Sequence, residues 1–181
     1  EVGQFPFNHL VGQENRKGLL TYSKRDYEQE SIPKTGNYLV DALEDGWYEH
    51  RTLKTKRQMR KAKTHDKQWE HTVWNLIASF DFEHVNDIKS RSFNFDGVHQ
   101  VDVFAQGSKM SICIECKSKE ELGKKSIRTY LLEMQGYRGE AEKRIKKAYG
   151  TDSSVAWVIA TNNIIIPKED QKYAEEIGIK L

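Results

Sequence analysis

The chain has 181 residues, of which 37% are hydrophobic, 31% charged and 10% aromatic, enough for one globular domain, or one domain with an appendage. The formal net charge of +2 is too small to indicate a nucleic-acid partner, so such an argument must rest on local clusters of charge. No apolar run is long enough to span a bilayer, and nothing at the start is typical of a signal peptide. We therefore expect a cytoplasmic protein without a membrane partner. Because the chain begins with Glu1 and ends in what resembles a strand cut short, we also expect further domains.

Residues 1–63 are predicted to form an N-terminal extension, an arm or a small subdomain, because their first part has little periodicity. The stretch from His50 to Lys67 is the most basic part of the chain, with eight Lys or Arg residues against one acid, Asp66. Two interpretations stay open: a solvated charge run, or a segment that contacts phosphates. Under the second interpretation, the nucleic-acid-binding residues are Lys54, Lys56, Arg57, Arg60, Lys61 and Lys63.

Residues 64–181 are predicted to form an α/β domain. The first helix lies in "THDKQWEHTVWNLIASF", where Thr64 or Asp66 can cap it and where apolar residues recur at helical spacing: Trp69, Val73, Leu76, Ile77 and Phe80. Three strands follow, in "FEHVND", in "SFNFDGVHQVDVFAQ" and in "MSICIECKS", the last two joined by a tight turn at Gly107 and Ser108.

A long amphipathic helix is predicted next, over residues 123–149. The nearly continuous apolar run "SSVAWVIATN" is typical of a strand covered on both faces, and a last helix begins at Pro167 and ends at Gly178. The order helix, three strands, helix, strand, helix (αβββαβα) predicts a central mixed β-sheet flanked by helices, preceded by the N-terminal extension.

Two of the predicted strands carry charged residues where a buried strand should be apolar. Asp102 stands between two valines, while Glu115 and Lys117 follow two isoleucines and share one face of their strand. Asp102 lies on the neighbouring strand of the hairpin, within reach across the ladder. Two converging carboxylates need a neutralising partner, and hard divalent cations prefer oxygen ligands. A lysine beside the metal would have a lowered pKa and would hold or deprotonate a water, so these are the parts for phosphodiester hydrolysis.

Structural interpretations compete with this site. Asp102 and Glu115 can be structural residues, one of them joined to Lys117 in a buried ion pair. The cysteines Cys113 and Cys116 form a C-x-x-C pattern, but residues three apart in a strand point to opposite faces and no second pair completes a zinc site. They fit better as two small apolar side chains in a reduced protein.

The motif residues resemble those of the PD-(D/E)xK nuclease superfamily, which has the fold of restriction endonucleases. Asp102 matches its first carboxylate, and "ECK" at residues 115–117 matches its E-x-K in the form frequent in Mrr-like restriction enzymes and archaeal Holliday-junction resolvases. Glu70, in "QWEHTVWNLI", resembles the glutamate of the first core helix, and "VAWVIATNNIII" with "YAEEIGIKL" is similar to the closing strand and helix of Mrr-like domains. The resemblance covers roughly residues 64–181, with Val101 in place of the family's proline.

The resemblance implies roles for these residues. Asp102 and Glu115 would bind Mg²⁺ or Mn²⁺ with the carbonyl of Cys116, Lys117 would orient or activate the attacking water, and Glu70 would help through a water or a second metal. Gln135 would be an accessory residue on the next helix, although an ordinary solvated position at the edge of the helix explains it equally well.

The sequence therefore predicts a Mg²⁺-dependent DNA endonuclease domain of a prokaryotic restriction, defence or DNA-processing protein. Cleavage of both strands usually needs two active sites, which favours a homodimer. The alternative is a catalytically silent nucleic-acid-binding or interaction module within a larger protein. A looser resemblance links "DGWYEHRTLKTKRQMRKAKTHDKQWEHTVW" to the nuclease-like front part of DGQHR-domain proteins, whose DGQHR motif is not in this chain.

Overall fold

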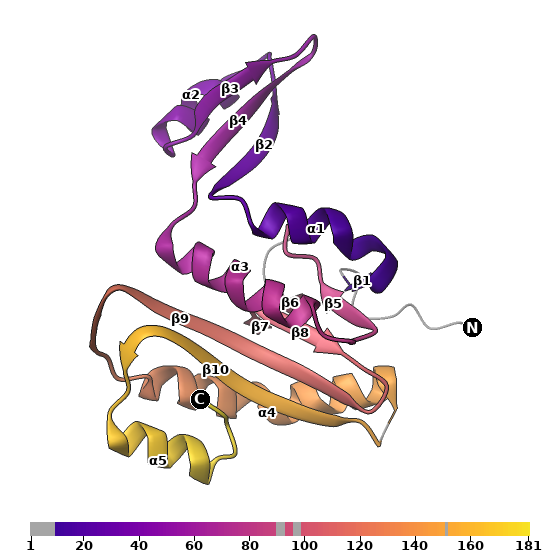
Figure 1. Cartoon of the computed structure of the whole chain (residues 1–181), viewed down its shortest axis with the longest axis vertical. Coiled ribbons are helices and arrows are strands. Elements are labelled where there is room, and N and C mark those ends of the chain that lie inside the picture. Colours follow the sequence, from indigo (N-terminus) through magenta and orange to yellow (C-terminus); the bar gives the residue numbers. More distant parts are fainter. Residues whose placement is uncertain (1–9, 90–92, 96–98, 151) are drawn as a thin grey trace.

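The computed structural model describes residues 10–89, 93–95, 99–150 and 152–181. Figure 1 shows a body, in which a sheet lies between two layers of helices, and a smaller sheet that projects from it. The predicted α/β class, with a central mixed sheet flanked by helices, is confirmed. No helix in the described part of the chain is both long enough and apolar enough to cross a membrane.

The sheet of the body has five strands in the order β1-β5-β8-β9-β10. Their bounds are Leu10–Gly12, His84–Asn86, Val103–Gln106, Met110–Lys124 and Ser154–Ile165. Neighbouring strands are antiparallel except β9 and β10, which run parallel because the helix α4 (Arg128–Tyr149) crosses between them. This parallel pair is the longest in the sheet. In β10, Trp157 and Ile159 are buried on the α4 side, whereas Val158 and Ala160 on the other face are only partly buried, so the full cover on both faces that the apolar run indicated is met in part.

Two hydrophobic cores lie on the two faces of this sheet. One face carries α1 (Arg16–Ser23) and α3 (His65–Ala78), and the other carries α4 and α5 (Lys168–Glu176) (Figure 1). Because side chains alternate along a strand, neighbouring residues of β9 enter different cores: Cys113 packs on the α4 side and Ile114 on the α3 side. Both cysteines of the chain are buried and free, which agrees with their interpretation as small apolar side chains.

Thr64 caps α3 as predicted, since its side chain accepts a hydrogen bond from the amide of Lys67. The predicted apolar stripe of this helix is wrong in part, because Leu76 is 58% exposed and Phe80 is 54% exposed. The helix is rotated so that Trp74 enters the core and donates from its indole to the backbone carbonyl of Asn86, 2.8 Å away. The spacing of Val73 and Ile77 is compatible with either rotation, which explains the error.

The predicted helix over residues 123–149 begins later, at Arg128. Gly123 and Lys124 belong to β9, where they pair with Ile164 and Ile165 of β10 beyond an irregularity in the register. Pro167 caps α5, and Gly178 ends it with a φ of 71°, the left-handed conformation that glycine adopts without strain. Two short strands, β6 (Phe93–Asn94) and β7 (Gln100–Val101), form a separate two-stranded sheet.

The projecting sheet consists of β2 (Tyr27–Pro33), β4 (Lys56–Ala62) and β3 (Tyr48–Thr52), in this order and all antiparallel. A short helix, α2 (Tyr38–Glu44), accompanies it. The N-terminal extension expected over residues 1–63 is thus divided. Its described first part, β1, the 3-10 helix η1 (Gln13–Asn15) and α1, packs into the body, and only the strands β2 to β4 with α2 stand apart (Figure 1).

Candidate active site

Asp102 lies in the gap between β7 and β8, where the chain leaves one small sheet and enters the central one. The buried side chain of Asn86, on β5, bridges this gap with two hydrogen bonds. Its amide nitrogen donates to the carbonyl of Asp102 at 3.1 Å, and its oxygen accepts from the amide of Phe104 at 3.0 Å. The same residue accepts the Trp74 indole at its backbone carbonyl, so α3, β5 and Asp102 are joined by one hydrogen-bonded chain.

This arrangement brings Asp102 to the E-x-K stretch on β9. The Oδ2 atom of Asp102 accepts a hydrogen bond of 2.7 Å from the backbone amide of Cys116. The described ladder between β8 and β9 begins at Val103 and Ile114, so the carboxylate satisfies an amide beyond the last paired residues. The carboxylate therefore lies directly at the residue between Glu115 and Lys117.

Glu115 and Lys117 share a face of β9, as predicted, and form an ion pair. Lys117 Nζ is 2.5 Å from Glu115 Oε1, and the two side chains are 19% and 21% exposed. The ammonium also lies 4.5 Å from the ring centre of Tyr130 on α4, a cation–π contact. The site is therefore half-buried between β9 and the beginning of α4.

Burial raises the pKa of both carboxyl groups of the site, and neighbouring negative charges add to the shift. The pKa of Asp102 is raised to about 7, by burial first and then by the neighbouring charge of Glu115. Burial also raises the pKa of Glu115, with Lys117 opposing the shift and with Glu70 and Glu133 adding to it. Both carboxyl groups are therefore harder to ionise than ordinary acids, and the charge of Glu115 opposes the ionisation of Asp102.

The sequence-based expectation that Lys117 has a lowered pKa beside a metal is not met among the protein groups alone. Burial lowers the pKa of Lys117, but the charge and hydrogen bond of Glu115 and the charge of Asp102 outweigh it, so the pKa lies above its ordinary value. Lys117 is consequently an ammonium ion at neutral pH. The ion pair that the structural interpretation required for one carboxylate is present here.

Glu70 faces the site from α3 but is engaged with its own helix. Its Oε2 atom is 2.6 Å from Lys67 Nζ, while its charge still contributes to the raised pKa values of Asp102 and Glu115. Gln135 is not brought to these residues. Its exposed side chain on α4 accepts a hydrogen bond of 2.7 Å from the Tyr173 hydroxyl of α5.

Within the described ranges, no three His, Cys, Asp or Glu side chains are gathered as a preformed metal cage. The fit of a divalent cation must therefore be judged from two carboxylates, Asp102 and Glu115, and the carbonyl of Cys116. These are hard oxygen ligands, and the raised pKa values of both acids mean that a cation would relieve a repulsion that is already built in. Mg²⁺ commonly uses only one or two carboxylates and fills its other positions with water and phosphate oxygens, so this donor set fits it.

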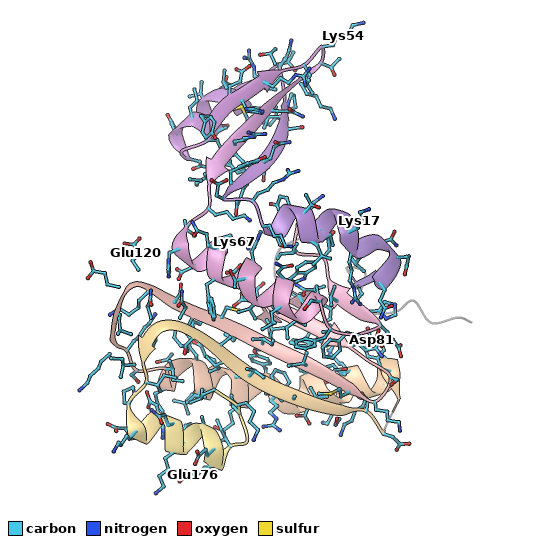
Figure 2. All side chains as sticks on the ribbon, in the orientation of Figure 1. Lys17, Lys54, Lys67, Asp81, Glu120 and Glu176 are labelled. Carbon is cyan, nitrogen blue, oxygen red and sulfur yellow. The ribbon has the colours of Figure 1, made fainter. Side chains whose placement is uncertain are left out.

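The predicted nucleic-acid-binding set of six basic residues does not form one surface. Lys63 is only 5% exposed and donates to the backbone carbonyl of Ser23 at 3.0 Å, so it lies apart from the exposed members of the set. Arg57 forms an ion pair of 2.6 Å with Glu49. Lys54 lies at the far tip of the projecting sheet, whereas Lys67 lies at the beginning of α3 beside the body (Figure 2). The expectation that this whole segment lies beside the cleft is therefore not met.

Sequence reasoning missed three residues of the site. Asn86, Tyr130 and Glu133 act on Asp102, Lys117 and Glu115 respectively, through a hydrogen bond, a ring contact and a charge. A buried asparagine at the end of a strand was a detectable signal, because such an amide must find partners. The other two lie on α4, and the spacing of that helix does not tell which side chains of β9 they meet.

Comparisons of the chain with family models, with curated proteins and with solved structures found no match. The site is therefore interpreted from its own geometry and from the motif that its residues carry.

Proposed function

We propose that this chain is a metal-dependent nuclease domain of PD-(D/E)xK type that hydrolyses phosphodiester bonds in DNA. One observation carries the proposal. The carboxylate of Asp102 is hydrogen-bonded to the backbone amide of Cys116, so the aspartate and the E-x-K stretch meet in space although the two residues are 14 positions apart in the sequence.

The order of elements supports the same proposal. From α3 onward the chain passes through β5, β8 and β9, then α4, β10 and α5, apart from the small β6–β7 sheet. This order agrees with the αβββαβα order that the resemblance to restriction endonucleases implies, and the two motif strands are neighbours in the sheet, with the charge of Glu70 on α3 acting on Asp102. A structural pair of acids would not require this order.

A bound Mg²⁺ or Mn²⁺ would be held by Asp102, Glu115 and the Cys116 carbonyl, with Glu70 beside them. Such an ion polarises a phosphoryl oxygen and lowers the pKa of a bound water. The chain's own contribution is to supply two partly desolvated carboxylates and to keep most bulk water away from them.

The structure favours one of the two roles considered for Lys117. An amine with a raised pKa is a poor base at neutral pH but a good positive donor. We infer that Lys117 orients the water or a phosphate oxygen and stabilises the negative charge that develops there. For this role it must exchange its ion pair with Glu115 for the substrate, which the exposed fifth of each side chain permits.

The second candidate function is a catalytically silent nucleic-acid-binding module. The Lys117–Glu115 ion pair favours it, because the pair satisfies both charges without a metal or a substrate.

A plasmid-cleavage assay with Mg²⁺ separates the two functions. The wild type should nick or linearise the plasmid, and Lys117→Met should lower the rate by about 100-fold to 10,000-fold, the usual contribution of a positioned proton donor or acceptor. Lys172→Met is the charge-matched control, since Lys172 is 79% exposed on α5. No Mg²⁺-dependent cleavage by a folded wild-type protein, or equal rates in wild type and Lys117→Met, would favour the silent module.

A further inference from the structure

The two faces of the projecting sheet differ in character. Residues paired across a β-ladder share a face, and residues alternate between faces along a strand. The pairs Tyr27–Ala62, Gln29–Arg60 and Tyr48–Arg60 therefore define one face. By the same register, this face holds Tyr27, Gln29, Ser31, Pro33, Tyr48, Arg51, Lys56, Gln58, Arg60 and Ala62. It is called the open face below, because none of these residues is buried.

The opposite, covered face holds Glu28, Glu30, Ile32, Glu49, Thr52, Arg57, Met59 and Lys61. Met59 is 0% exposed here, and the Lys61 side chain lies within 3.9 Å of the position of a Cβ on Gly46, just after α2. The helix α2 therefore lies on this face. One face of the sheet is packed and the other is left to the solvent.

Charge is separated in the same way. The open face carries three cations and no acid within the three strands, whereas the covered face carries two cations and three acids. Among the described residues, no acidic side chain forms a salt bridge with Arg51, Lys56 or Arg60. The open face is therefore positively charged, although the net charge of the whole chain is close to zero.

Aromatic rings accompany these cations. The Arg60 guanidinium lies 4.0 Å from the ring centre of Tyr27 and donates from Nε to Gln29 at 3.1 Å, so its terminal groups are held in one orientation. Tyr48, paired with Arg60 from the other side, is 51% exposed. Fixed guanidinium groups suit phosphates, and an exposed ring on a flat sheet suits the face of an unpaired base.

We propose that the open face binds a single-stranded stretch of nucleic acid, with its phosphates on Arg51, Lys56 and Arg60 and a base stacked on Tyr48. The inference rests on the proposed function, because it assigns this surface to the nucleic acid that the body cleaves. A strand is favoured over a duplex because the bases of a duplex are already stacked on each other, which leaves no ring face for Tyr48.

Binding of a labelled single-stranded DNA oligonucleotide, titrated at several salt concentrations with EDTA present, tests the open face. Arg51→Gln/Lys56→Gln should lower the slope of log affinity against log salt by about 1.4, because each phosphate contact on a single strand contributes about 0.7. The matched control is Arg57→Gln/Lys61→Gln, which removes the same charge from the covered face of the same sheet. It should leave the slope unchanged, and equal changes in both variants would overturn the proposal.

Tyrosines on the two sides provide a second matched pair. Tyr48→Ala should weaken single-strand binding by about tenfold to hundredfold, the usual loss for one stacked base, and should weaken duplex binding much less. Tyr38→Ala is the control, because Tyr38 is 55% exposed on α2, next to the covered face. A loss of the same size in Tyr38→Ala, or no loss in Tyr48→Ala, would overturn the assignment of the base to Tyr48.

These measurements are independent of cleavage. If the body does not cleave DNA but the open-face variants lose binding, the proposed nuclease fails and the open face stands. If the body cleaves DNA while the open-face and covered-face variants bind alike, the open face fails and the nuclease stands.

Discussion

The body and the projecting sheet place their charges in opposite surroundings. In the body, Asp102, Glu115 and Lys117 are partly desolvated, of mixed sign, and coupled so strongly that all three pKa values are displaced. The charged side chains on the open face of the projecting sheet are all positive, and they lie at solvent-facing positions without acidic partners among the described residues. The partly buried charges of the body lower the stability of the fold and are suited to catalysis. The exposed charges of the open face cost little stability and are suited to binding a polyanion.

The comparison teaches where each kind of function can be built. Reactive groups gain strength from burial, so they need a rigid core around them, and here that core is the β8–β9 pair with α4. A binding surface needs only accessible side chains of the right charge. A small three-stranded sheet with a single fully buried side chain, Met59, is therefore sufficient. Variants in the two regions should therefore separate cleavage from binding.

The largest expected effect is on cleavage by the body. Asp102→Asn and Glu115→Gln should each lower the cleavage rate at least about a thousandfold, because each removes a charged ligand for the metal. DNA binding should stay within a few-fold of wild type or improve slightly, since the acids repel the phosphate backbone. Plasmid cleavage with Mg²⁺ and oligonucleotide binding with EDTA measure the two effects.

Glu120→Gln is the control for this separation, because it removes an exposed carboxylate from the same strand, β9 (Figure 2). It should cleave like wild type. If Asp102→Asn and Glu115→Gln lost DNA binding while keeping their fold, the division between the two regions would be wrong.

Asn86 tests whether the body site depends on its buried scaffold. Asn86→Ala leaves the Asp102 carbonyl and the Phe104 amide without their partner, so the free energy of unfolding should fall by about 2–4 kcal/mol. Asp102 should also shift, and a displacement of about 1 Å is enough to cost about 100-fold in rate. We expect kcat to fall at 25 °C while KM for DNA changes little, as measured by initial rates alongside urea denaturation.

Asn75→Ala on α3 is the control, since this side chain is only half-buried and should affect neither quantity strongly. A destabilised Asn86→Ala protein with an unchanged kcat would show that the Cys116 amide alone positions Asp102.

The sequence predicted the parts of this site that depend only on the alternation of side chains along a strand. Alternation along β9 placed Glu115 and Lys117 together, and the short hairpin placed Asp102 opposite them. The pattern did not predict the ion pair's effect on Lys117, because that effect is a balance between burial and two neighbouring charges. Such a balance depends on distances that spacing does not contain.

The projecting sheet shows the opposite limit. Its basic run was visible, but its acids, Glu28 and Glu30, lie about 30 residues earlier and meet β4 only through the register of β2. The register also separates Arg57 and Lys61 from Arg60, which are neighbours in sequence but point to different faces. The burial of Lys63 depends on where α1 ends, which no local pattern specifies.

The smallest effect is expected at the joint between the two regions, where His71 of α3 lies under Lys63. His71 is 1% exposed, and neither ring nitrogen makes a hydrogen bond of normal geometry in the described structure, although the Ser23 backbone lies near enough to oppose the lowering of its pKa. Burial first, and then the charges of Lys63 and Lys67, lower the pKa of His71 to about 3 from an ordinary 6.5. Between these values the unfolded chain binds a proton that the folded protein does not, so His71 makes the fold less stable as the pH falls from about 6.5 towards 3.

His71→Leu removes that penalty and keeps an apolar group in the core. At pH 5 the variant should gain about 2 kcal/mol in free energy of unfolding over its difference from wild type at pH 8, because about 1.4 kcal/mol accompanies each pH unit below 6.5. Urea denaturation of both proteins at pH 8, 6.5 and 5 measures this gain, with His50→Leu on the exposed strand β3 as the control. If the difference between wild type and His71→Leu did not change with pH, the pKa of His71 would be the same in the folded and the unfolded protein, and burial would not oppose its protonation.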